Sequence, residues 1–298
     1  MTGLLWGLLG ALLIGASDCT ARFTSQRMSL LPLIFCIMAI STVALTIGLV
    51  ATGNLPRWHT SAWLYSAASG ALNIVALFFL YKALAHGPVS VASPTASSFA
   101  VILVVLNAIA GEPWTAYQAF AVVMVFVGIA MLSARSDQSK AKQYSKQWLR
   151  KTSQFAMCAA LTVSFRMFFA QEATAELGAT SALYLNRLFA LATCTAALII
   201  IPMLQRKSAT TVVPNQWPQG KVRWFVLLQA LFEMGAFAAF LTGSAGPDRV
   251  AVTIGFSTFA AATALIAWAV LKEPIGWWRG GWIVFISIGV MIASVGGS

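Results

Sequence analysis

Long apolar runs constrain the fold of this chain more than any other feature of its sequence. They cover residues 3–20, 29–52, 61–84, 88–110, 115–134, 152–174, 179–203, 222–243, 249–271 and 277–296. A helix needs ~20 apolar residues to span a bilayer, so each run predicts one transmembrane helix. Only 9% of the residues are charged, against about 25% in soluble domains, which excludes a soluble globular protein.

The sequence around the fifth run resembles the sequence around the tenth. Glu112-Pro113 and Glu273-Pro274 are 161 residues apart, and Gly128 and Gly289 share the same offset. Each Glu-Pro pair stands directly before an apolar run of about the same length. This ordered set indicates an internal duplication.

Two five-helix repeats are predicted over residues 1–135 and 152–298, with a basic cytoplasmic linker over 136–151. Loops after odd-numbered runs, counted with the run ends that adjoin them, hold fifteen Lys and Arg residues, whereas those after even-numbered runs hold Arg57 and Arg249. Basic residues accumulate in cytoplasmic loops, so both termini are predicted to be periplasmic and the protein to span the inner membrane many times. Five helices per half then give an all-α, 5+5 inverted repeat around a central cavity, as in many secondary transporters.

Several kinds of chemistry have no motif in the sequence. It contains no GxxxxGK[ST] run and no HExxH, and its acidic residues are dispersed. We therefore expect no ATP hydrolysis, no enzyme activity, no bound metal and no cofactor. The net charge of +11 is explained by cytoplasmic loops, so no nucleic-acid partner is expected.

Four of the charged residues inside the runs stand clear of the basic loops as candidates for a role at bilayer depth, where an ion is costly unless it faces a cavity or another charge. Arg187 and Glu233 are predicted either to line the cavity or to form a buried ion pair between the seventh and eighth runs. Asp18 lies near the cytoplasmic end of the first run, so an interfacial or capping role is favoured. Arg166 either lines the cavity or pairs with Asp18 or a backbone carbonyl.

The fourth run carries Ser93, Pro94 and Ser97 on one helical face. Gly255 and Thr258 stand at the same offset of 161 from Pro94 and Ser97. Both halves thus combine a helix-breaking residue with a hydroxyl at equivalent depth, which is typical of transporter binding sites. Close packing of helices by small residues is the alternative.

Polar, charged and aromatic side chains near these faces make up the predicted substrate cavity. Its residues are Asn73, Phe78, Tyr81, Ser93, Pro94, Ser97, Phe99, Phe165, Arg166, Tyr184, Arg187, Glu233, Phe237, Gly255, Phe256 and Thr258.

The run from Tyr81 to Pro94, YKALAHGPVSVASP, resembles the third and fourth helices of the EamA family, in the drug/metabolite transporter superfamily. The two Glu-Pro elements resemble the next part of that pattern, although Lys272 stands where the family usually has a small residue. The length and the aromatic-rich runs are most similar to the YddG-type exporters of amino acids. The resemblance implies ten helices around a cavity lined by helices one, three, four, six, eight and nine.

We therefore expect a transporter that exports small metabolites, above all amino acids including aromatic ones, by alternating access. Glu233 is predicted to bind the ammonium group, and Arg166 or Arg187 the carboxylate. The partners expected are the small-molecule substrate and the lipid bilayer, with the chain a monomer or weak dimer. A drug or nucleoside exporter is the nearest alternative. A membrane-embedded lipid-modifying enzyme is a further one, and it requires a carboxylate cluster.

Overall fold

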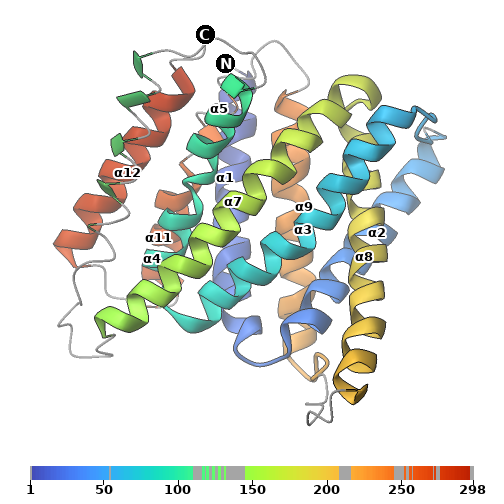
Figure 1. Cartoon of the computed structure of the whole chain (residues 1–298), viewed down its shortest axis with the longest axis horizontal. Helices are drawn as coiled ribbons and strands as arrows, with labels where there is room; N and C mark the ends of the chain where they lie inside the picture. The colour runs from blue at the N-terminus through green and yellow to red at the C-terminus, as the bar shows by residue number, and fades with distance from the viewer. Residues whose placement is uncertain are drawn as a thin grey trace.

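The structure, a computed structural model, is a bundle of helices (Figure 1). It describes residues 2–53, 55–109, 145–207, 216–244, 258–270 and 276–295, with isolated residues between 116 and 131 and at 252, 255, 256 and 272. No strand occurs among these described residues. The helices are α1 (Thr2–Ser25), α2 (Leu30–Thr52), α3 (Thr60–His86), α4 (Val89–Ala96), α5 (Phe99–Ile109), α7 (Lys146–Leu177), α8 (Ala179–Lys207), α9 (Val222–Ser244), α11 (Phe259–Val270) and α12 (Trp277–Val295).

Helices long and apolar enough to cross a bilayer are α2, α3, α7, α8 and α9. The segments Phe259–Val270 and Gly280–Gly289 are apolar but shorter. Large apolar side chains such as Leu64, Ile47 and Leu265 are exposed on the outside of the bundle. Because soluble monomers rarely expose so much apolar surface, the chain is a multi-pass membrane protein.

The helix boundaries differ from the predicted ones in informative ways. α1 continues five residues past the predicted end at residue 20, and α7 begins at Lys146, inside the predicted linker. Ser145 starts α7 because its hydroxyl accepts a hydrogen bond from the Trp148 N–H (3.2 Å). The predicted helix over 115–134 lies largely outside the described residues, as does most of the linker.

Two glycines in the left-handed region (φ > 0) end helices at one face of the bundle. Gly53 (φ 68°) closes α2, and its N–H donates to the Val50 carbonyl. Gly178 (φ 78°) separates α7 from α8, and its N–H donates to the Thr174 carbonyl. A side chain would be strained at either position, so glycine fixes these two turns.

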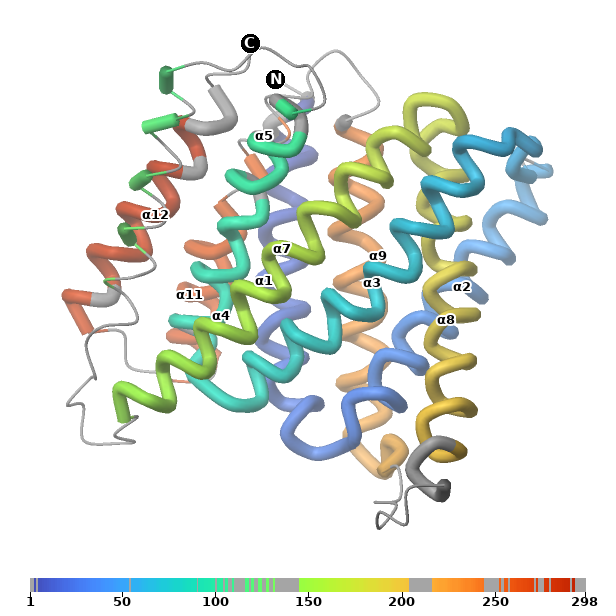
Figure 2. The backbone as a smooth tube through the Cα atoms, in the orientation of Figure 1, coloured from blue at the N-terminus to red at the C-terminus, as the bar shows by residue number. Residues whose placement is uncertain are grey.

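Helices of the first part of the chain pack along helices of the second part (Figure 2). α1 packs along α9, and α3 packs along α7. Likewise α1 packs on α11 and α4 on α7, while α3 packs on α8 and α2 on α9. The predicted repeat relates α1 to α7, α2 to α8 and α3 to α9, and the α4–α5 run to the run that ends in α11. Under this relation the contact of α1 with α9 matches that of α3 with α7, and the contact of α3 with α8 matches that of α2 with α9.

The fourth predicted run is two helices, α4 and α5, with a break at Ser97 and Ser98. The Ser97 hydroxyl donates to the Pro94 carbonyl (2.7 Å), and the Ser98 N–H donates to the Thr95 carbonyl (3.3 Å). The Thr258 hydroxyl, directly before α11, donates in the same way to the Gly255 carbonyl (2.7 Å). The same hydroxyl-to-carbonyl turn therefore recurs at the offset of 161 residues.

Side-chain contacts bring the end of α1, the end of α3 and the start of α7 together. The Arg22 guanidinium donates to the Leu84 carbonyl, and the Trp148 indole donates to the His86 carbonyl (2.7 Å). The rings of His86 and Trp148 stack with their centroids 3.9 Å apart. These helix ends and the turn after α1 carry the basic residues Arg22, Arg27, Lys82, Lys146, Arg150 and Lys151.

Candidate functional site

A small cavity of ≈ 70 Å³ lies in the middle of the bundle. Its described walls come from α1, α3, α4, α5, α7, α9 and α11, together with Phe256 just before α11. These are the helices that the resemblance implied. The lining residues are Ile14, Ser17, Asp18, Ala76, Leu77, Leu80, Tyr81, Ala96, Phe99, Ala159, Val163, Arg166, Met167, Glu233, Phe237, Phe256 and Phe259.

Six of the residues predicted for the cavity line it. They are Tyr81, Phe99, Arg166, Glu233, Phe237 and Phe256. Arg187 lies directly behind Glu233, and Ser93 directly behind Asp18. The lining does not include the other predicted residues, which are Asn73, Phe78, Pro94, Ser97, Phe165, Tyr184, Gly255 and Thr258.

Phe165 is 38% exposed, on the outside of the bundle, and is not among the residues that line this cavity. Successive residues of a helix point about 100° apart. Because its neighbour Arg166 points into the bundle, Phe165 turns outward. Tyr184, three residues before Arg187 on α8, is half-buried.

Other predicted residues stabilise the packing around the cavity. The Asn73 amide lies 3.5 Å from the Met38 sulfur, between α3 and α2. Gly255 packs against α1, because a Cβ at Gly7 would lie 2.9 Å from the Gly255 Cα. These residues shape the bundle without facing the cavity.

Arg187 and Glu233 form a buried ion pair between α8 and α9. The Arg187 Nη1 lies 3.0 Å from one carboxylate oxygen of Glu233 and 2.8 Å from the other. The Arg187 side chain is fully buried and that of Glu233 is 4% exposed. This geometry is the buried ion pair that was one of the two predicted alternatives. In it, Arg187 neutralises the charge of Glu233.

Arg166 has no carboxylate partner among the described residues, although only 5% of it is exposed. Its Nε makes no hydrogen bond there, and its guanidinium carbon lies 4.3 Å from the centre of the Phe237 ring. Arg187 lies 5.4 Å from the same ring centre. Two guanidinium groups therefore surround one ring and one carboxylate, which leaves an excess of positive charge at this wall.

Asp18 lies in the interior of the bundle and not at the membrane interface, where the sequence predicted it. It is 3% exposed and stands seven residues before the end of α1, or about 10 Å along the axis. One of its carboxylate oxygens accepts a hydrogen bond from the Ser93 hydroxyl (2.8 Å), and the Thr263 hydroxyl lies 3.5 Å from the same oxygen. No cation pairs with it among the described residues.

Four phenylalanines contribute aromatic rings to the apolar part of the cavity wall. The ring centres of Phe99 and Phe259 are 6.0 Å apart, and those of Phe256 and Phe259 are 5.9 Å apart. Phe237 completes the set from α9. Phe259 was not predicted, but it follows the Gly255–Thr258 turn as Phe99 follows the Pro94–Ser97 turn, so the repeat offset points to it within one residue.

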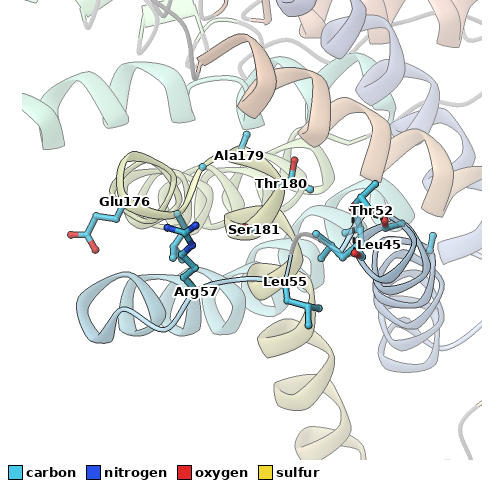
Figure 3. A pocket seen from close by; sticks show the side chains of 13 residues that line it. Leu45, Thr52, Leu55, Arg57, Glu176, Ala179, Thr180 and Ser181 are labelled. Carbon is cyan, nitrogen blue, oxygen red and sulfur yellow. Dashed lines mark hydrogen bonds between the residues drawn. The ribbon is translucent and has the colours of Figure 1, made fainter.

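A second, larger pocket of ≈ 630 Å³ opens at the end of the bundle that carries Gly53 and Gly178 (Figure 3). It lies between α2, the segment around Arg57 and the junction of α7 with α8. Glu176 at its edge lies 2.5 Å from the His59 ring and accepts a hydrogen bond from Ser61. The central cavity is the better candidate, because it combines buried unpaired charges with both broken helices.

The described residues contain no cluster of three or more His, Cys, Asp or Glu that could hold a metal ion. The cavity instead offers a guanidinium group, a carboxylate and aromatic rings. Such a set can bind a charged organic molecule and release it unchanged.

Residues 1–134, which are the first predicted repeat, match the model of the EamA-like transporter family. No curated protein matches the chain. One solved structure, titled "Crystal structure of protein", is similar to the chain with a TM-score of 0.66 and 15% identity, over 98% of this chain and 96% of that one. At this identity the likeness shows a common fold alone.

Proposed function

We propose that the chain is a secondary transporter of the drug/metabolite superfamily that moves amino acids out of the cell by alternating access. The observation that carries this proposal is the central cavity, where unpaired charges of both signs are buried beside two broken helices. Charged groups at membrane depth are costly and mark substrate pathways. The match of residues 1–134 to a family of transporters supports the same function.

The proposed architecture is ten membrane spans arranged as two inverted five-helix repeats. The paired helix contacts support it, as does the recurring turn of Ser97 and Thr258 onto Pro94 and Gly255. In inverted-repeat transporters, the substrate binds between the repeats at discontinuous helices near the midplane. The central cavity has this position, since both broken helices contribute to its wall.

Amino acids suit this cavity better than drugs or nucleosides do. Residues of opposite charge line it together with phenylalanine rings, as a zwitterion with an apolar side chain requires. A drug exporter needs little polar specificity, and a nucleoside needs amide or hydroxyl groups that pair with its base. Among amino acids, aromatic ones fit the rings best, in keeping with the exporters that the sequence resembles.

The cavity must widen before it holds such a substrate. A water molecule takes up about 30 Å³ of liquid, so ≈ 70 Å³ holds about two, whereas ligand pockets are typically about 300–1,000 Å³. We take the structure as a contracted state of the transport cycle. Opening then requires one half of the bundle to rock against the other.

Pro94→Ala is expected to slow this movement while leaving substrate affinity within a few-fold of wild type. Proline lacks the N–H that a continuous helix needs, so alanine restores a hydrogen bond just before the α4–α5 break and stiffens it. We expect turnover to fall by up to about tenfold, equivalent to ~1.4 kcal/mol on the barrier. Flux and thermal-shift binding in the same preparation separate the two effects. Unchanged flux would show that Pro94 is a packing kink only.

The proposed orientation places the basic end of the bundle in the cytoplasm. A reporter that is active only in the cytoplasm, inserted after Lys142, is therefore expected to be active. The same reporter fused after Ser298 is expected to be silent. The reverse pattern would mean that both termini are cytoplasmic.

Transport into proteoliposomes across a panel of radiolabelled amino acids tests the proposed function. We expect concentration-dependent, saturable uptake of at least one amino acid, with aromatic ones transported best. Liposomes without protein are the control. Uptake of nucleosides or cationic drugs, with none of any amino acid, would favour the alternative substrates.

A further inference from the structure

We infer that Asp18 and Arg166 bind the two poles of a zwitterionic substrate, Asp18 the ammonium group and Arg166 the carboxylate. This assignment rests on the proposed function and sharpens it. It also replaces Glu233, the carboxylate predicted from the sequence, with Asp18. The assignment is based on pairing: Glu233 already has an ionic partner inside the protein, whereas Asp18 and Arg166 have none among the described residues.

Glu233 is unsuited to bind an ammonium group because Arg187 already neutralises it. The pair is buried, and the guanidinium reaches both carboxylate oxygens. A substrate amine at Glu233 would have to displace or share that guanidinium. It would also meet a second cation, Arg166, which lies near the same Phe237 ring as Arg187.

Asp18 is a carboxylate prepared for a cation that the protein does not supply. Its two hydroxyl neighbours, Ser93 and Thr263, come from α4 and α11, on opposite halves of the chain. Burying an unpaired ion is costly, so its presence at a cavity wall indicates a cationic ligand.

Arg166 is the complementary group, a buried guanidinium without an anion. Its stacking over Phe237 orients the planar fork, and guanidinium forks bind carboxylates in a bidentate way. Asp18 and Arg166 line the same cavity from α1 and α7, yet they do not form an ion pair. A molecule that carries both charges, separated by a short distance, satisfies both residues at once.

The two poles also lie on elements that correspond between the repeats. α1 and α7 are the first helices of the two predicted halves, so a zwitterion held by both links the halves directly. The phenylalanine rings of α5, α9 and α11 remain to contact the side chain of the substrate. The site therefore selects α-amino acids with apolar side chains over molecules that carry one charge.

Two matched sets of ligands test this assignment on the purified full-length protein. The sets are L-phenylalanine, L-phenylalaninamide and 3-phenylpropionate, and L-alanine, L-alaninamide and propionate. The amide lacks the carboxylate and the deaminated acid lacks the ammonium group. Binding is measured as the ligand-dependent thermal shift of wild type, Asp18→Asn, Arg166→Gln and Glu233→Gln. The control is Leu161→Val, an exposed change on α7.

Wild type and Leu161→Val are expected to prefer the amino acid over either analogue by at least about tenfold. Asp18→Asn should lose the preference over the deaminated acid and keep the preference over the amide. Arg166→Gln should show the converse. Because each result is a ratio within one variant, a partly unstable variant still gives an answer, and Arg166→Lys is the substitute if Arg166→Gln fails to fold.

Equal losses for all ligands in Asp18→Asn would overturn the assignment, since they would indicate a site for a coupling proton or Na⁺. Loss of the preference in Glu233→Gln alone would return the ammonium site to Glu233. If wild type binds neither amino acid and moves none of the panel into proteoliposomes, the proposed function itself fails. The two failures are therefore distinct.

Discussion

Glu233→Gln will lower the free energy of unfolding by about 3–5 kcal/mol, because it leaves the fully buried Arg187 guanidinium without a counter-charge. Glutamine has the same shape as glutamate, so lost packing contributes little. Unfolding of the purified protein in detergent, followed by tryptophan fluorescence, measures the change.

A double variant, Arg187→Met with Glu233→Met, is the matched control. It removes both charges together, and replacing a buried ion pair by apolar residues is often close to neutral. We expect it to recover stability to within about 1–2 kcal/mol of wild type. A Glu233→Gln protein as stable as wild type would mean that the pair contributes nothing to holding α8 against α9.

Gly70→Leu will prevent α3 from packing on α8 and will cost at least about 3 kcal/mol. A Cβ at Gly70 would lie 2.7 Å from the Asn186 carbonyl oxygen and 2.9 Å from the Ala190 nitrogen. These are backbone atoms that cannot rotate away, so the cost exceeds the ~1–3 kcal/mol typical of overpacking. The shift would also move Arg187, the next residue after Asn186, away from Glu233.

Gly48→Leu is the control for Gly70→Leu. Gly48 is also inside a helix, α2, but a Cβ there would meet nothing within 4 Å. Leucine has the higher helix propensity, so we expect stability equal to or slightly above wild type. Yield and melting of the two variants in the same detergent give the comparison. Equal behaviour would contradict the close approach of α3 and α8.

The apolar runs were sufficient to predict most of the helices, because a backbone in lipid must satisfy its hydrogen bonds internally. They were less informative about where helices end. α1 continues to Ser25 because Thr20 and Arg22 are compatible with a helix, and no Pro or Gly stands between Gly15 and the end of α1. That extension moved Asp18 from the expected interface to the interior.

The direction in which each side chain faces could not be derived from single runs. Phe165 and Arg166 are adjacent, and the local sequence does not say which of the two faces the cavity. The sequence also could not decide whether Arg187 and Glu233 form an ion pair, because they become partners only through the contact of α8 with α9. The offset of 161 did carry such information, because it relates Phe99 to the neighbourhood of Phe259.

Counterflow in proteoliposomes is the most direct test of the central claim that the cavity alternates between the two sides of the membrane with an amino acid inside. Vesicles are loaded with unlabelled L-phenylalanine and diluted into a trace of the labelled form, with no ion gradient or membrane potential. We predict a transient accumulation of label above its equilibrium level, which is absent in protein-free vesicles and delayed by Pro94→Ala. Uptake that never exceeds the protein-free level, with any amino acid loaded, would contradict the account.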